Sequence, residues 1–232
     1  MKSVLKFIWR WTWRLTISFF VITIFWVIAL KWINPPFTVL QIRENFKNEG
    51  KQLREWKDMD EIAPAMALAV VSSEDQNFMK HNGFDFGAIE KAVKFNEKNT
   101  KKKRGASTIS QQTAKNVFLW PNRSWLRKGL EVYFTALIEF VWGKERILEV
   151  YLNVIETGTN TFGVQAASKK FFKKDAVKMS KSECALIAAA VPSPRKSNPG
   201  KPSAYMLKRK EQILRQMRML GDGYFERHGG LD

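Results

Sequence analysis

Cysteine is nearly missing from this sequence. Cys184 is the only one among 232 residues, so the chain can form neither an internal disulfide nor a zinc site built from cysteines. It lies in an apolar run, from 184 to 191, where a small buried residue is expected rather than a nucleophile. The cysteine count alone does not place the chain in a cellular compartment.

Acidic residues are scarce beside basic ones, and no internal repeat or convincing run of alternating strands is present. Lys and Arg number 39 against 22 Asp and Glu, which leaves a net charge of +17. Such an excess points to a polyanionic partner: a nucleic acid, an anionic membrane surface or a phosphorylated substrate. The hydrophobic share of 45% allows one well-filled domain but hardly two. Because helical spacing dominates, the expected fold class is mainly α.

Charged residues are missing altogether from positions 15 to 30. A membrane-spanning helix needs about 20 apolar residues, so we expect an anchor over 15–33 whose flanking Arg14 and Lys31 extend toward the headgroups. Tryptophans flank the stretch on both sides, as in interfacial belts, and no small-x-small cleavage site follows. A buried core helix and a cleaved signal peptide are the alternatives.

The charges before this stretch predict its orientation. The basic residues that precede it are Lys2, Lys6, Arg10 and Arg14. By the positive-inside rule they place residues 1–14 in the cytoplasm. Asn34, Pro35 and Pro36 are expected to end the helix. Residues 34–232 then form the domain outside the cytoplasm.

Two polar stretches are expected at the surface of that domain. Thr38 to Lys57 is periodic and polar, which predicts a surface helix. Asn96 to Gly105 is a charged, flexible loop with little to bury. The cations from Lys101 to Arg104 suit an anionic headgroup, and a solvated linker is the alternative.

Two adjacent carboxylates, Glu74 and Asp75, end an apolar segment that predicts a buried helix from 63 to 71. Burying carboxylates is costly unless something pairs or uses them. At the edge of an apolar site, desolvation raises the pKa of a carboxylate toward the range of a general base. The alternative is a pair that caps the next helix, with His81 hydrogen-bonded nearby.

A second polar motif runs from 105 to 119, where Ser107 or Thr108 can cap a new helix. Positions spaced by four and three residues share one face of a helix. The polar stripe comprises Thr108, Gln112 and Lys115, widened by Gln111 and Asn116. Uncharged amides beside one lysine suit sugar hydroxyls and a phosphate, whereas a solvated face usually carries mixed charges.

A third motif places Arg127, Lys128 and Glu131 within one turn of a helix that Asn122 or Ser124 opens. The alternative is a surface ion pair between the first and last of them, worth a few tenths of a kcal/mol. Further helices are expected over 144–153, after Gly143, and over 205–220, before Gly221.

Five blocks in series resemble the peptidoglycan glycosyltransferases, a lysozyme-like family that polymerises lipid II. The blocks are EDQNFMKHNGFD from Glu74, GASTISQQTAKNVF from Gly105, RKGLE from Arg127, KERILEVYLN from Lys144, and ALIAAAVPSP from Ala185 on to NP. The resemblance covers about residues 63–220, and five blocks in order behind an anchor are highly specific. It implies a mainly α, two-lobed, lysozyme-like helical domain behind one transmembrane helix. Since no transpeptidase domain follows, the monofunctional biosynthetic form is expected.

The resemblance also implies a mechanism. In the family, the 4-hydroxyl of an acceptor lipid II attacks the anomeric carbon of the growing glycan with inversion and displaces undecaprenyl pyrophosphate. Glu74 matches the family's general base. Glu131 matches its second glutamate, which organises the cationic site, with a divalent metal (Mg²⁺ or Mn²⁺) as the expected cofactor. The expected contacts to substrate or pyrophosphate are Asp75, Phe78, His81, Thr108, Gln111, Gln112, Lys115, Asn116, Arg127 and Lys128.

The implied partners are lipid II, the nascent glycan, the membrane and other cell-wall synthesis proteins, without nucleic acid. The implied location is the bacterial inner membrane, with the catalytic domain in the periplasm. One rival is a lysozyme-type hydrolase or lytic transglycosylase, whose leaving oxygen needs a general acid and for which the cationic cluster has no clear purpose. Another rival is a membrane-tethered basic adaptor that binds anionic lipid or nucleic acid through charge alone.

Overall fold

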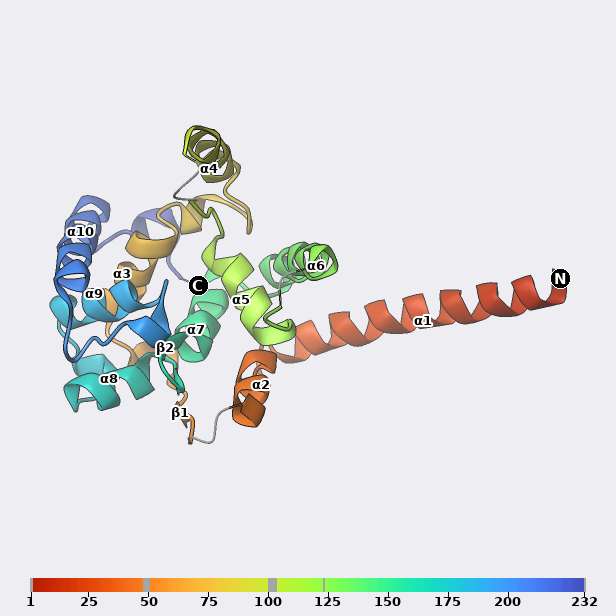
Figure 1. Cartoon of the computed structure of the whole chain (residues 1–232), viewed down its shortest axis with the longest axis horizontal. Coiled ribbons are helices and arrows are strands. Elements are labelled where there is room, and N and C mark those ends of the chain that lie inside the picture. Colours follow the sequence, from red (N-terminus) through yellow and green to blue (C-terminus); the bar gives the residue numbers. More distant parts are fainter. Residues whose placement is uncertain (1, 48–50, 100–103, 123, 232) are drawn as a thin grey trace.

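The computed structural model describes residues 2–47, 51–99, 104–122 and 124–231, and this part of the chain is mainly α, as predicted (Figure 1). Its α-helices are α1 (Lys2–Ala29), α2 (Val39–Lys47), α3 (Pro64–Glu74), α4 (Phe86–Lys98), α5 (Ile109–Phe118), α6 (Trp125–Val141), α7 (Lys144–Val154), α8 (Val164–Phe172), α9 (Lys181–Ala190) and α10 (Ala204–Leu220). Its strands are β1 (Leu53–Arg54), β2 (Glu156–Gly158) and β3 (Thr161–Phe162). The predicted headgroup contacts at Lys101–Lys103 lie outside the described residues.

The helices form two lobes, as the resemblance implies. In one lobe α3, α9 and α10 pack against one another, and in the other α5 packs against α2, α6 and α7 (Figure 1). The two lobes share one apolar core, which includes Met66 of α3, Ile138 of α6 and Ile213 of α10. Helix α8 contacts both α7 and α9 and so completes the connection. The end of α3 and the polar face of α5 therefore meet where the lobes join.

A small sheet replaces part of the surface helix predicted over 38–57, and that prediction is wrong for residues 51–57. Strand β1 pairs in parallel with β3, and β3 pairs antiparallel with β2. The amide of Leu53 donates to the carbonyl of Asn160 at 2.9 Å. Asn153 also holds both backbone groups of Lys57. These partners lie about a hundred residues away, so a local pattern of spacing does not show them.

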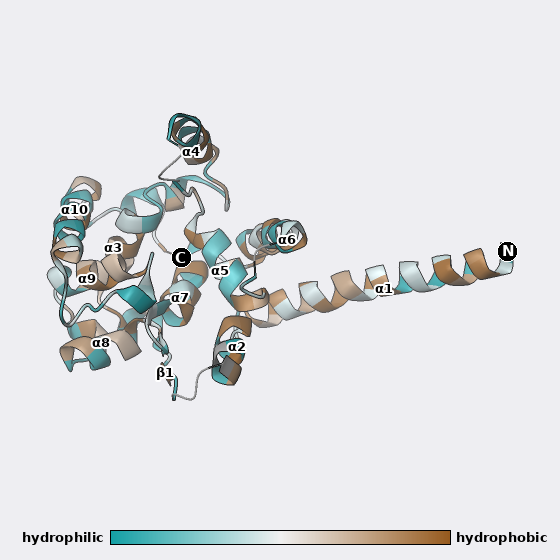
Figure 2. Ribbon diagram, in the orientation of Figure 1, coloured by the Kyte–Doolittle hydropathy of each residue, from teal (hydrophilic) through white to brown (hydrophobic). Residues whose placement is uncertain are grey.

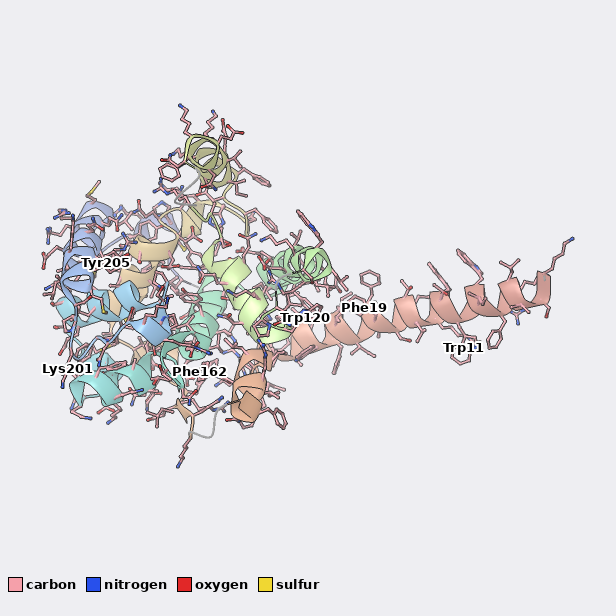
Figure 3. The ribbon with its side chains drawn as sticks, viewed as in Figure 1. Trp11, Phe19, Trp120, Phe162, Lys201 and Tyr205 are labelled. Atoms are coloured by element: carbon pink, nitrogen blue, oxygen red, sulfur yellow. The ribbon has the colours of Figure 1, made fainter. Side chains whose placement is uncertain are left out.

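Helix α1 is long and apolar enough to cross a membrane, and among the described residues it is the one helix that is. Its N-terminal part, with Trp11, projects from the body (Figures 1 and 3). Its C-terminal part is docked: Trp142 Nε1 donates to the carbonyl of Val27 at 2.7 Å. The helix ends at Ala29, before the predicted Asn34, and Arg146 donates to the carbonyls of Leu30 and Ile33 that follow it.

Candidate active site

Helix α3 ends at Glu74, three residues beyond the predicted end at residue 71, and leaves this carboxylate partly exposed. The side chains before it, from Met66 to Ser72, are buried. Glu74 Oε2 accepts a hydrogen bond from Gln112 Nε2 at 3.0 Å. Its Oε1 accepts a longer one from Ser73 Oγ at 3.3 Å. The carboxylate is thus oriented by neutral donors and remains open to solvent or a substrate.

The neighbouring carboxylate of Asp75 serves the fold instead. Its Oδ1 is hydrogen-bonded to His81 Nε2 at 2.9 Å, and its Oδ2 accepts from the backbone amide of Ile109 at 2.9 Å. That amide opens α5, where a negative charge is stabilised by the helix dipole. The capping alternative therefore describes Asp75, although the helix that it serves is α5. The next helix along the chain, α4, is capped by Asp85.

Three further residues predicted to contact substrate have structural partners. Phe78 is fully buried beneath Lys144, whose Nζ lies 4.7 Å from the ring centre. Thr108 is the N-cap of α5, as predicted, and its Oγ1 donates to the carbonyl of Gly83 at 2.7 Å. Gln111 completes the capping box by accepting from the amide of Thr108. The first turn of a helix leaves amides without internal partners. The side chains of Thr108 and Gln111 supply acceptors for such amides at the start of α5.

Six of the remaining predicted residues line a cavity of about 450 Å³, to which Gln111 also contributes, whereas His81 and Glu74 are not part of its lining. Polar residues reach it from two helices: Gln112, Lys115 and Asn116 from α5, and Arg127, Lys128 and Glu131 from α6. Figure 2 shows the hydrophilic colouring of α5, which faces this region. The size suits a compact polar group rather than a whole polymer.

The ion pair between Arg127 and Glu131 is buried rather than at the surface, which contradicts the surface-pair alternative. Glu131 is 3% exposed; its Oε2 lies 2.7 Å from Arg127 Nη1 and its Oε1 lies 2.5 Å from Lys128 Nζ. Arg127 is 9% exposed, and its Nε has no hydrogen-bond partner within the described part of the chain. A buried donor without a partner is costly. An oxyanion in the cavity would supply the missing acceptor.

The residues around Glu131 do not fit a metal ion held by the protein alone. Both of its carboxylate oxygens already accept from cations. Within the described residues, no group of three or more His, Cys, Asp and Glu side chains could hold a metal. Mg²⁺ is usually bound by one or two carboxylates together with substrate phosphates and water. Glu131 by itself therefore organises cations.

Two residues that the sequence patterns did not assign to the site support Glu74 from behind. Tyr151 of α7 is fully buried and donates to Gln112 Oε1 at 3.4 Å, which turns the amide nitrogen of Gln112 toward Glu74. Burial, and next the charges of Glu74 and Asp75, raise the pKa of Tyr151 well above its ordinary value, so it stays a donor. From the sequence, Tyr151 was placed only within the helix expected over 144–153.

Arg209 of α10 is the second of these residues. Its Nη2 donates to the carbonyl of Ser73 at 3.2 Å and so satisfies the last turn of α3. The lysines and arginines of the final helix gave no sign of this contact, because it joins positions far apart in the sequence.

Comparison with known proteins agrees with this geometry. The family model described as Transglycosylase matches residues 41–218. A biosynthetic peptidoglycan transglycosylase of Bacteroides thetaiotaomicron is 51% identical over 93% of this chain and 89% of its own length. Proteins of the same name from Bdellovibrio bacteriovorus and Yersinia pseudotuberculosis are each 46% identical. The former covers 94% of this chain and 88% of its own length, and the latter 100% and 99%. The chain therefore belongs to the transglycosylase family.

Proposed function

We propose that this enzyme polymerises lipid II into linear β-1,4 glycan strands of peptidoglycan, inverting the anomeric carbon and releasing undecaprenyl pyrophosphate. One observation carries the proposal. Gln112 of α5 both lines the cationic cavity and hydrogen-bonds Glu74 at the end of α3, so a candidate base and a candidate diphosphate site are neighbours joined by one side chain. Lipid II and the growing glycan supply the hydroxyl and the diphosphate that these two groups suit.

Glu74 is the proposed general base. As the acceptor's 4-hydroxyl oxygen forms a bond to the anomeric carbon, its proton passes to a carboxylate oxygen of Glu74. The bond from that carbon to the diphosphate oxygen breaks in the same step. A positioned base contributes about 10²–10⁴-fold to such a transfer. The hydrogen bond from Gln112 Nε2 holds the Glu74 carboxylate in place. Because an amide does not transfer its proton to a carboxylate, Glu74 stays available as a base.

The cations of the cavity are proposed to stabilise the departing diphosphate. Its oxygens gain negative charge as the bond breaks, and preorganised donors act most strongly on charge that develops in the transition state. Arg127 presents a buried Nε without a partner within the described residues, and Lys115 and Lys128 also line the cavity. The divalent metal predicted at Glu131 stays a prediction, and a variant series described below tests it.

A glycan hydrolase is the second candidate and fits less well. Its leaving sugar oxygen needs a proton from a general acid. Glu131, the carboxylate that lines the cavity, is held by two cations and is not placed as a proton donor. An adaptor that binds through charge alone does not account for the hydrogen bonds from Tyr151 to Gln112 and from Gln112 to Glu74.

We also propose a single-pass location in the bacterial inner membrane, with the N-terminus in the cytoplasm and the catalytic domain in the periplasm. The support is the apolar helix α1 and the cations at its N-terminal end. Anchoring confines the enzyme to the surface where a polyprenyl-linked substrate lies and raises its effective concentration. Other cell-wall synthesis proteins stay a prediction as partners.

Incubation with fluorescent lipid II tests the proposal. The wild type should yield polymer, and Glu74→Gln should lose at least about 10²-fold in rate with an unchanged melting temperature, because Gln keeps the shape and removes the basicity. Glycan added in place of lipid II should stay intact. A Glu74→Gln rate within about tenfold of the wild type contradicts the role of the base. Cleavage of added glycan would favour the hydrolase.

A further inference from the structure

The segment after α10, residues 221–231, folds back onto the loop that follows Glu74. It lies beyond residue 218, where the match to the family model ends. The chain turns at Gly221, whose φ of +78° is a conformation that side chains with a Cβ rarely adopt. Three residues later Tyr224 is 2% exposed and belongs to the apolar core. A terminal segment that buries an aromatic ring in the core is tied down rather than frayed.

The hydroxyl of Tyr224 binds the backbone of the loop after Glu74 at two points. It donates to the carbonyl of Gln76 at 3.0 Å and accepts from the amide of Met79 at 3.4 Å. The loop's own bonds use other groups, from Phe78 to Asp75 and from Lys80 to Asn77. The phenol therefore pairs with the carbonyl of Gln76 and the amide of Met79, two groups that the turn's own hydrogen bonds do not use.

Tyr224 is in turn held by its own segment and by α9. His228 Nδ1 lies 2.8 Å from the carbonyl of Tyr224, and the two rings are 4.8 Å apart. Lys181 at the start of α9 binds Asp222 at 2.8 Å. Burial raises the pKa of Tyr224 above its ordinary value, so the phenol keeps the proton that it donates. The segment thus forms a clamp, by which we mean residues 221–231, with the Tyr224 hydroxyl at its tip.

We infer that Tyr224 is a positioning residue for Glu74. It fixes the backbone between Gln76 and Met79, directly after the carboxylate, and thereby the end of α3. The inference rests on the proposed role of Glu74 as the base. A base acts only within hydrogen-bond reach of the proton that it takes. Misplacement by about 1 Å can cost on the order of 10²-fold in rate. Tyr224 itself does not line the cavity.

The test is Tyr224→Phe, which keeps the ring in the core and removes only the hydroxyl. We expect lipid II turnover at saturation to fall about tenfold. KM should stay within twofold, because no cavity residue changes. Amide exchange in residues 76–81 should be faster in the variant. The matched control is Tyr205→Phe on α10, where the tyrosine is 73% exposed at the surface (Figure 3). Neither the turnover nor the amide exchange in residues 76–81 should change in this control.

A second variant guards against a general loss of folding. Lys181→Ala removes the tie between Asp222 and α9 and leaves Tyr224 in place. This variant should lower turnover and speed amide exchange in residues 76–81, each by about twofold, which is less than in Tyr224→Phe. Turnover of Tyr224→Phe within twofold of the wild type overturns the inference. So does faster exchange spread evenly over α3 and α9 with kcat unchanged, since that is the result of a purely structural role.

Failure of this inference is distinguishable from failure of the proposed function. If Glu74→Gln retains activity, Glu74 is not the base, whatever the clamp does. If Glu74→Gln is inactive while Tyr224→Phe turns over and exchanges like the wild type, only the clamp is wrong.

Discussion

Burial decides what each charged residue of the site does. Glu74 is partly exposed, and within the described part of the chain it accepts hydrogen bonds from the neutral donors Gln112 and Ser73. Asp75, its neighbour in sequence, is buried between a histidine and a helix amide. Adjacent carboxylates at the end of α3 therefore have different partners, and a residue type alone does not distinguish them. The same reasoning applies to the lysines.

Lys128 and Lys169 offer a matched comparison of two lysines in ion pairs. Lys128 Nζ binds Glu131 in the cavity, and Lys169 Nζ of α8 binds Asp175 at 2.7 Å. The side chains of these two lysines are 44% and 49% exposed. We expect Lys128→Ala to lower turnover by about tenfold or more, because it removes a donor aimed at developing charge. Lys169→Ala should stay within twofold. Steady-state rates and acceptor binding, measured together, check this. Equal losses in both variants would mean that only net charge matters.

Glu131→Gln separates an organiser of cations from a metal ligand. The pairing with Arg127 and Lys128 predicts a loss of at least about tenfold in rate, since both cations lose a buried counter-charge. It also predicts that activity responds to Mg²⁺ with the same midpoint as in the wild type. Polymerisation rates and melting temperatures over a Mg²⁺ series provide the measurement. A midpoint shifted to higher Mg²⁺ would make Glu131 a metal ligand, and a wild-type rate would reduce the cluster to a structural pair.

At the scale of elements, local signals in the sequence predicted what local chemistry determines. Thr108 and Ser124 cap α5 and α6, Gly143 precedes α7, and Gly221 ends α10. Each of these assignments depends on residues within one helical turn, where a side chain and a backbone amide are neighbours by construction. The gathering of α5 and α6 side chains around one cavity followed from the resemblance and not from spacing.

What the sequence could not predict depends on contacts between distant positions. Strand β1 is held by residues near 160, and a strand of two residues carries no readable alternation. Burial of Phe78 and Thr108 follows from packing against Lys144 and Gly83, which no local pattern indicates. The contacts of Tyr151, Arg209 and Tyr224 with the site are of the same kind. Tertiary packing thus gave several polar or aromatic residues structural partners that the sequence did not indicate.

Helix α1 is more than a tether, because its C-terminal part belongs to the domain. Thr23 Oγ1 and Tyr133 Oη are hydrogen-bonded at 2.8 Å, and Val27 is fully buried. If residues 15–33 lie in the bilayer as predicted, this side of α6 lies at the same depth. The exposed apolar side chains of Val132 and Phe140 on α6 suit such an environment. The domain would then lie against the membrane rather than above it.

For the molecule as a whole, charge and length together predict its orientation. Helix α1 has 28 residues, so at a rise of 1.5 Å per residue it is about 42 Å long, close to the thickness of a bilayer with its headgroups. Its basic residues, at positions 2, 6, 10 and 14, all lie in the half that projects from the domain. Cations near the end of a span are retained in the cytoplasm, so the domain at the other end is expected outside.

A reporter enzyme that is active only outside the cytoplasm tests this orientation. Fused after Asp232, it should be active, because the span delivers everything beyond it to the outer side. Fused after Arg14, before the span, the same reporter should be silent, which controls for expression and export. Replacing the four N-terminal cations with glutamine should reduce the activity of the first fusion, since the charge bias that sets the orientation is then lost. Cytoplasmic activity of a second reporter after Asp232, or a mature chain that begins beyond Ile33, would contradict an uncleaved anchor with an external catalytic domain.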